Sequence, residues 1–184
     1  GPRVINTDKF KALVTEADKR GALVHIHAIG DQAVTDALDA VAAARKANGD
    51  SGIPHTITHL EVVLPTDVPR FAELGVIASM QLFWAQENEY TDELLKPYLD
   101  PGLYANIYPA RSIRDAGGII AGATDWPVDV ASPFLEMAVG IGRSDGTHPT
   151  FMPDQTLTNE DMLYAFTINA AKAARIDDVA GSIE

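Results

Sequence analysis

Residues 22–31 read Ala-Leu-Val-His-Ile-His-Ala-Ile-Gly-Asp, and the rest of the chain is interpreted around this stretch. The run is short, apolar and contains β-branched residues, and it ends at a glycine and an acid before a long helical pattern. This pattern predicts a buried parallel strand that leads into a helix. Side chains alternate along a strand, so His25 and His27 share one face, with His27 nearer the carboxyl end, where α/β enzymes place their chemistry. His27 is the better candidate for a metal ligand, and the alternative is that both histidines are core residues.

Composition excludes several classes of protein. The chain has 184 residues, a formal net charge of −12 and no cysteine. Residues 1–184 are expected to form a single domain, and the negative charge favours a small-molecule substrate over nucleic acid or an anionic membrane. Without cysteine, a metal would need histidine and carboxylate ligands. Neither a membrane span nor a signal pattern is expected, and the compartment stays open, with the cytoplasm favoured.

Helical and strand patterns alternate along the chain. Beyond the first strand, apolar strand patterns cover 55–63, 76–82 and 119–124, and helical spacing covers 8–19, 31–48, a short segment that ends near 74, 110–116, 133–141 and 158–174. Thr7 or Asp8, Asp31 and Thr158 are the expected N-caps, and a cap is favoured over a catalytic role for Asp31. This order predicts a parallel sheet with right-handed crossovers.

Three residues of types that bind metal ions occupy equivalent positions in the predicted fold. His27, His59 and Asp125 each lie at or just beyond the carboxyl end of a different predicted strand. Neighbouring parallel strands present such side chains to one site, and imidazole with carboxylate suits zinc, iron or manganese. Trp84, in the aperiodic stretch 83–108, and Trp126 flank the expected mouth of this site and are the candidates for substrate binding, with packing as the alternative.

The motifs around these residues resemble those of a known family. His-Ala-Ile-Gly-Asp at 27–31, Thr-His-Leu-Glu at 58–61 and Thr-Asp-Trp-Pro-Val at 124–128 are similar to motifs of the amidohydrolase superfamily, specifically amidohydrolase family 3, the YtcJ-like metal-dependent hydrolases. The resemblance continues through residues 71–79 and 167–171, so it covers nearly the whole chain.

The resemblance implies a fold and a set of roles. The family fold is a (β/α)8 TIM barrel, and the four strands here correspond to barrel strands five to eight, so the expected fold is α/β, half of a barrel with parallel strands. His27 and His59 are then metal ligands, and Asp125 both binds metal and accepts the proton of the hydrolytic water. The implied cofactor is a divalent metal, with zinc favoured and iron or manganese as alternatives.

The chain also departs from the family pattern. The strand-one His-x-His pair and the strand-four bridging ligand are absent, and the chain begins at Gly1-Pro2, so it is expected to be the carboxyl half of a longer protein. With half of the ligands missing, the chain alone is expected to bind metal weakly and to hydrolyse little. A half barrel also exposes two sheet edges and its inner face, so self-association is expected.

Other titratable residues carry weaker expectations. His25 is expected to be a core histidine or a partner of a ligand, and His55 and His148 are expected to have no catalytic function. Arg111 and Arg143 are expected either to form surface ion pairs or to bind an anionic substrate.

The sequence therefore predicts a metal-dependent hydrolase of carbon–nitrogen bonds in amides, formamides or cyclic amides. The alternative is a non-catalytic regulatory or ligand-binding module on the same fold. The two differ in whether function depends on His27, His59 and Asp125.

Overall fold

Four parallel strands form the centre of the computed structural model, which describes residues 5–183. They are β1 (His25–Ala28), β2 (Thr56–His59), β3 (Ile77–Met80) and β4 (Ile119–Gly122), and their order in the sheet is the order in the sequence. Each strand is hydrogen-bonded in parallel to its neighbour, with His27 in register with Thr58. The predicted parallel sheet is confirmed, and β1 and β4 are its two edges.

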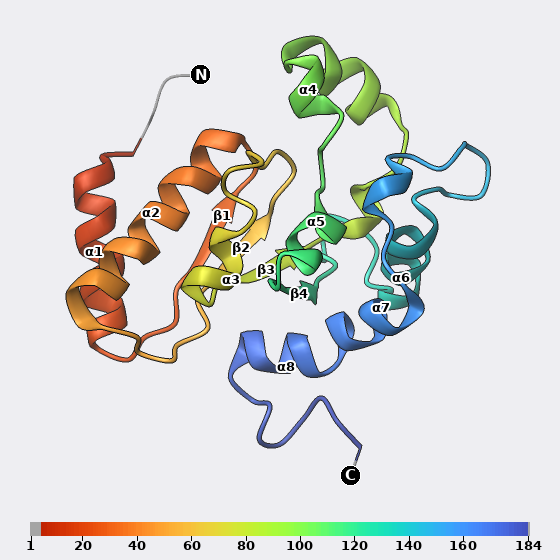
Figure 1. Cartoon of the computed structure of the whole chain (residues 1–184). Coiled ribbons are helices and arrows are strands. Elements are labelled where there is room, and N and C mark those ends of the chain that lie inside the picture. The colour runs from red at the N-terminus through yellow and green to blue at the C-terminus, as the bar shows by residue number, and fades with distance from the viewer. Residues whose placement is uncertain (1–4, 184) are drawn as a thin grey trace.

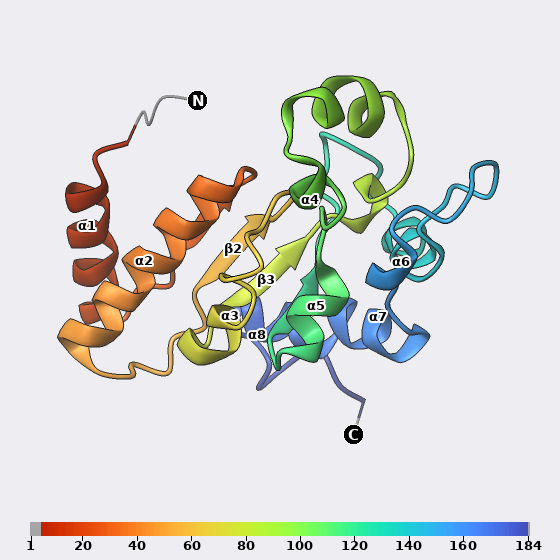
Figure 2. The ribbon, with the colours of Figure 1, turned by 45° about the horizontal axis from the view of Figure 1, so that its top comes forward.

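Helices follow and precede the strands in alternation (Figures 1 and 2). They are α1 (Thr7–Lys19), α2 (Asp31–Asn48), α3 (Arg70–Leu74), α4 (Pro101–Tyr104), α5 (Ala110–Asp115), α6 (Pro133–Gly142), α7 (Asn159–Phe166) and α8 (Ile168–Ala174). The predicted excursion after β3 holds short turns of helix over Leu82–Trp84, Tyr90–Leu95 and Lys96–Tyr98, followed by α4. Within residues 5–183, the structure contains no helix that is long and apolar enough to cross a membrane.

The structure corrects two of the predicted N-caps. Asn6 caps α1, because its side chain accepts a hydrogen bond from the backbone of Lys9 at 2.9 Å. Gly30 occupies the cap position of α2 without a side-chain hydrogen bond, so Asp31 is the first helical residue. The negative charge of Asp31 interacts favourably with the helix dipole at this end. Thr158 caps α7 as predicted, in a reciprocal capping box with Asp161.

The last helical pattern forms two helices, not one. The backbone leaves helical geometry at Thr167, with φ of −121° and ψ of −101°, and α8 starts at the next residue. The Thr167 hydroxyl donates to the Leu163 carbonyl at 2.6 Å, so the side chain takes an acceptor that the backbone of a continuing helix would use. Helical periodicity alone does not reveal such a break.

The helices pack against both edge strands of the sheet and bury most of the sheet. Helix α2 packs on α1 and β1, whereas α5, α7 and α8 contact β4. Figures 1 and 2 show α1 and α2 together on the β1 side, well separated from α6 and α7. Strands β2 and β3 are buried at every residue, but β1 exposes both His25 and His27. The prediction of a buried first strand is therefore wrong at the histidine face, because within residues 5–183 β1 is an edge strand of the sheet.

A candidate metal-binding and substrate site

His27 and His59 lie side by side at the carboxyl edge of the sheet. Their ring centroids are 4.2 Å apart and the ring planes make an angle of 68°. His27 is in register with Thr58, so a regular strand would turn the next side chain, His59, to the opposite face. His59 instead has a left-handed φ of 78°, which interrupts the alternation and allows its ring to lie against His27.

Left-handed backbone recurs at the ends of two site strands. Leu60 follows His59 with a φ of 58°, and Asp125, just beyond β4, has a φ of 54°. Residues other than glycine adopt this region at a cost of about 1 kcal/mol or more, and such residues cluster at functional sites. Two of the three residues that the sequence selects as metal ligands therefore have strained backbone.

His59 is buried and electrically neutral in this setting. Its side chain is among the buried polar groups, and its Nδ1 atom has no hydrogen-bond partner. Burial lowers the pKa of His59, the neighbouring His27 lowers it further, and the charge of Asp125 raises it only in part. A neutral imidazole with a free nitrogen is the form that binds metal.

The Trp84 ring covers one face of the His59 ring. Its ring stacks on the His59 ring with centroids 5.5 Å apart and an interplanar angle of 12°. The indole Nε1 donates to Asp129 at 2.9 Å, which fixes the orientation of the tryptophan. Trp126 is 68 % exposed and is not among the residues that line the cavity beside Trp84. Its contact with substrate therefore stays a prediction.

The residues present fit part of a metal site. Two imidazoles adjoin, one of them with an orphaned nitrogen, and the charge of Asp125 raises the pKa of His59 against the larger effect of burial. In the part of the chain that the structure describes, however, no three His, Cys, Asp or Glu side chains are grouped closely enough to hold a metal ion. The chain therefore supplies two neighbouring donors without a complete ligand set.

A cluster around Glu61 lies next to the histidine pair, and the sequence arguments gave it no role. The Glu61 carboxylate is 3 % exposed and accepts hydrogen bonds from the hydroxyls of Tyr108 and Tyr90, the latter at 3.3 Å. Burial raises the pKa of Glu61, and the two tyrosine hydrogen bonds partly offset this effect. The available signal was its position in Thr-His-Leu-Glu, two residues after a strand-end histidine.

A cavity of about 360 Å³ opens between this cluster and Trp84. Its wall consists of residues that follow β1, β2, β3 and β4, among them Ile29, Glu61, Trp84 and Asp129. The carboxyl ends of the parallel strands thus define one concave surface, which is where α/β enzymes bind substrate.

The loop that carries Trp84 is held by a buried carboxylate of α6. Glu136 is fully buried, and its Oε2 accepts a hydrogen bond from the backbone N–H of Phe83 at 2.7 Å. Burial raises the pKa of Glu136 to about 7 against the effect of its backbone hydrogen bonds. This contact fixes the backbone one residue before the tryptophan that stacks on His59.

Comparison with known proteins assigns the family. A sequence model of the amidohydrolase family matches residues 1–184. The chain belongs to the amidohydrolase family. It is 29 % identical over 184 residues to the protein LONG AFTER FAR-RED 3 of Arabidopsis thaliana, covering 100 % of this chain and 31 % of that protein. It is also 29 % identical over 196 residues to an N-substituted formamide deformylase of Arthrobacter pascens, covering 100 % of this chain and 33 % of that enzyme.

A solved structure supports the same assignment at the level of the fold. The crystal structure of an uncharacterized metal-dependent hydrolase from Pyrococcus horikoshii OT3 matches with a TM-score of 0.80 and 24 % identity, over 100 % of this chain and 36 % of that one. This member of the amidohydrolase family therefore spans about a third of the length of its curated relatives. The predicted fold class, half of a (β/α)8 barrel with parallel strands, is confirmed.

In this amidohydrolase chain, the remaining candidate residues lie outside the His27–His59 pair. His25 is exposed, with Nδ1 2.5 Å from the Thr56 hydroxyl, so it is not a core histidine. His55 is fully buried near the amino end of β2, and His148 is exposed beside Asp145. Arg111 pairs at the surface with Asp115 at 3.4 Å.

The expected surface ion pair of Arg143 is wrong, and its contact with an anionic substrate stays a prediction. The side chain is fully buried, and its Nη2 donates to the carbonyls of Tyr108 at 2.7 Å and Gln155 at 2.9 Å. The guanidinium therefore joins loop backbones in the interior and forms no surface ion pair. Burial lowers the pKa of Arg143 to about 10.

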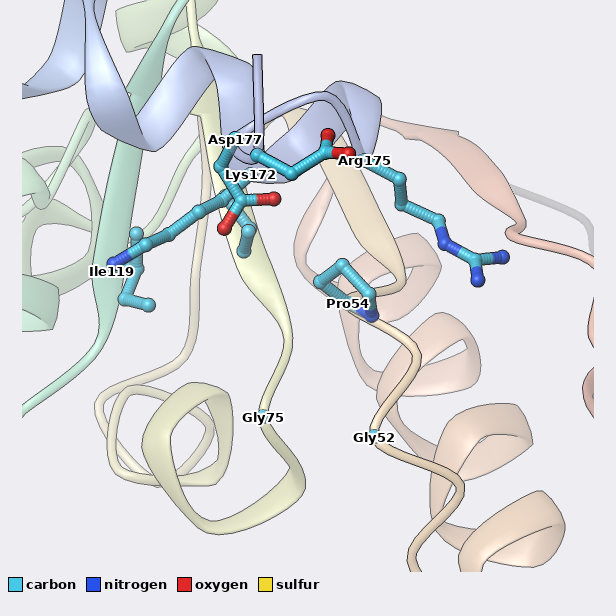
Figure 3. A pocket seen from close by; sticks show the side chains of 9 residues that line it. Gly52, Pro54, Gly75, Ile119, Lys172, Arg175 and Asp177 are labelled. Atoms are coloured by element: carbon cyan, nitrogen blue, oxygen red, sulfur yellow. The ribbon is translucent and has the colours of Figure 1, made fainter. Parts of the chain in front are cut away.

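A second hollow, of about 450 Å³, lies at the amino end of the strands, opposite the histidine pair. Figure 3 shows Lys172, Arg175 and Asp177 projecting from the end of α8 and the residues just after it, near Pro54 and two loop glycines. Arg175 donates to the Gly21 carbonyl at 2.9 Å. Residues at this end of a β/α barrel contribute to stability, whereas the carboxyl end carries the chemistry.

Proposed function

We propose that this chain contributes one half of the active site of a metal-dependent hydrolase that cleaves carbon–nitrogen bonds in amides, formamides or cyclic amides. The observation that supports the proposal most directly is the His27–His59 pair, 4.2 Å apart, with an orphaned nitrogen on the buried ring. The similarity to a relative named N-substituted formamide deformylase supports the choice of bond.

Each residue has a distinct proposed role. His27 and His59 would hold a divalent metal, with zinc favoured and iron or manganese as alternatives, and Asp125 would hold it and accept a proton from the hydrolytic water. A bound divalent ion supplies an acidified water and a polarised carbonyl. Trp84 excludes water from one side of His59 and keeps its ring in place, and Trp126 is proposed to contact the substrate.

Metal content tests the site directly in this chain. Zinc added to the chain is expected to bind His27 and His59 more weakly than zinc binds a complete site, because only two neighbouring donors are formed. Elemental analysis after dialysis at several zinc concentrations should therefore show binding at high zinc that the His27→Ala/His59→Ala variant loses. His148→Ala, an exposed histidine elsewhere, is the matched control. Equal zinc in all three proteins would contradict the proposal.

The role of Asp125 is tested in the full-length protein. Asp125→Asn keeps the shape of the side chain but removes its basicity, so amide hydrolysis should fall by at least about a hundredfold. The isolated chain is proposed to be inactive, since it spans about a third of its relatives.

The alternative, a regulatory or ligand-binding module, is favoured by one observation, the lack of three grouped ligands within residues 5–183. In that case the function of the full-length protein would survive Asp125→Asn, and hydrolysis of amides, formamides or cyclic amides would be undetectable in the unsubstituted protein as well.

A further inference from the structure

We propose that the cavity beside Trp84 binds an organic cation, a protonated amine carried on an apolar group. The inference rests on the proposed function for its meaning, because it names the substrate class of that site. Binding of the cation itself needs neither metal nor hydrolysis. The preference for a cation follows from the hydrogen-bonding groups of the cavity wall, some of which are already used within the protein while others are free.

The hydroxyl and indole donors of the wall are occupied within the protein. The hydroxyls of Tyr90 and Tyr108 both donate to Glu61, and the Trp84 indole donates to Asp129 at 2.9 Å. The side-chain amides of Gln86 and Asn88 each donate one hydrogen bond to a backbone carbonyl, at 2.6 Å and 3.3 Å. A ligand that needs the donors of Tyr90, Tyr108 or Trp84 would have to break an existing hydrogen bond.

The acceptors of the wall are in excess. Gln86 is 8 % exposed, and its Oε1 atom is buried without a hydrogen-bond partner. Its amide cannot be reversed, because the oxygen would then face the Phe83 carbonyl. The Glu61 carboxylate offers about four lone-pair sites, of which the two tyrosines use two. A buried acceptor left unpaired costs about 1–3 kcal/mol, so this wall favours a ligand that brings N–H donors.

The charges and aromatic rings of the wall restrict the chemical class of the ligand further. The charged residues described in the wall are Glu61 and Asp129, and no lysine or arginine is among them. The lining also includes four aromatic side chains, and a cation is attracted to the faces of such rings as well as to carboxylates. Amide or hydroxyl ligands would satisfy Gln86 but leave the negative charge of Asp129 uncompensated, and an anion would be repelled by that charge.

A neighbouring acidic hollow strengthens this preference. This hollow, of about 340 Å³, shares Asn88 with the cavity and is lined by four acids, Glu87, Glu89, Asp92 and Glu93, together with His148. With the formal net charge of −12, these acids raise the local concentration of cations beside the cavity. The field of these acids therefore favours an ammonium group over a neutral or anionic one.

Three probes that share a phenylethyl group test the proposal by calorimetric titration of the chain in the presence of EDTA. Phenethylammonium carries the proposed chemistry, 2-phenylethanol is its neutral counterpart and 3-phenylpropionate its anionic one. We expect the ammonium to bind at least about tenfold more tightly than the alcohol, since one desolvated cation–π and carboxylate contact supplies that difference. The carboxylate should not bind. Equal affinity for ammonium and alcohol, or no binding of the ammonium at millimolar concentration, would overturn the proposal.

Variants then assign the binding to this cavity. Asp129→Asn removes the charge and keeps one oxygen that can accept from the Trp84 indole, so ammonium affinity should fall at least about fivefold while the affinity for the alcohol stays unchanged. Asp154→Asn, an exposed acid outside the cavity wall, is the matched control. Circular dichroism establishes that each variant is folded. Full affinity in folded Asp129→Asn would contradict the assignment.

The two proposals fail in different ways. If the cation binds but zinc does not depend on His27 and His59, the hydrolase assignment fails and the cation site stands. If zinc binding depends on the histidines but phenethylammonium does not bind, the hydrolase assignment stands and this substrate class is excluded.

Discussion

Asp18 is a buried carboxylate that joins three parts of the chain far from the candidate site. Its side chain is removed from solvent and accepts hydrogen bonds from Arg45 at 2.8 Å, Asn48 at 2.8 Å, Ser51 at 2.5 Å and His55 at 2.9 Å. These contacts connect α1 with the end of α2 and the start of β2. The contact with Asp18 also gives His55, for which no catalytic function is expected, a structural role.

The hydrogen bonds of His55 determine its proton position. Nδ1 accepts from the backbone N–H of Val24 at 3.2 Å, so the ring proton lies on Nε2 and is donated to Asp18. Burial lowers the pKa of His55, with the Arg45 charge adding to the effect and Asp18 opposing it. The ring is therefore neutral, and Arg45 is the cation that balances Asp18.

Stability should depend on Asp18 in acid. Burial alone would raise the pKa of Asp18, but its hydrogen bonds and Arg45 lower it from 3.8 to about 2. A lowered folded-state pKa stabilises the protein above pH 3.8, and this stabilisation, about 2 kcal/mol, is lost as the pH falls toward 2. Urea unfolding of Asp18→Asn should give a lower free energy of unfolding at pH 7 and a weaker dependence on pH between 4 and 2. The exposed Asp178→Asn should match the unsubstituted chain, and an unaltered pH profile in Asp18→Asn would exclude this account.

At the scale of elements, the contact of α7 with β4 depends on a residue without a side chain. The ring of Phe166, at the end of α7, lies where a Cβ atom on Gly122 would be. Gly122 does not need an unusual φ here, so the requirement is one of space. This close approach lets the helix cover the last strand directly.

Gly122→Ala should therefore destabilise the chain by about 1–3 kcal/mol, because the added methyl group would displace an aromatic ring in a packed core. Gly142→Ala is the matched control, since Gly142 is helical and has open space around its Cβ position. The control should be neutral or slightly stabilising, because alanine favours helix. Thermal unfolding of both variants measures the difference, and equal melting temperatures would contradict the packing argument.

The alternation of helices and strands was predictable because apolar periodicity encodes it locally. The orientation of His59 was not, since it depends on a single left-handed residue that places the ring on the face of His27. Likewise, nothing local distinguishes Arg143, whose partners are carbonyls of residues far along the chain. Trp84 was predicted to lie at the mouth of the site, but three polar residues of the cavity wall were missed, because Glu61, Gln86 and Asp129 come together only after the strands align. The proposed roles of His27, His59 and Asp125 remain predictions.

At the scale of the whole molecule, both edges of the sheet are open, and an apolar segment next to the sheet is exposed. Residues 126–135, which follow β4, expose Trp126, Val128 and Phe134 by 68 %, 72 % and 78 %. The inner face at β1 exposes His25 and His27. Exposed edges and contiguous apolar residues favour association with another polypeptide.

We expect the isolated chain to self-associate through this segment. Sedimentation over a range of protein concentrations should give a mass above that of one chain, increasing with concentration. Phe134→Ser should shift the equilibrium toward the monomer because it removes the most exposed ring of the segment. Tyr98→Ser is the matched control, since Tyr98 is 83 % exposed on the excursion after β3. A single-chain mass at every concentration would exclude self-association.

The order of the strands also has a consequence for how the chain acquires its structure. Because the spatial order β1-β2-β3-β4 repeats the order of synthesis, each strand that emerges from a ribosome finds its hydrogen-bonding neighbour already made. The sheet can grow by accretion at one edge, with no gap left for a later segment to enter, and domains synthesised from the amino end fold in that direction. If translation pauses after β3, the first three strands already have their neighbours, and the β3 edge is the one that β4 covers later.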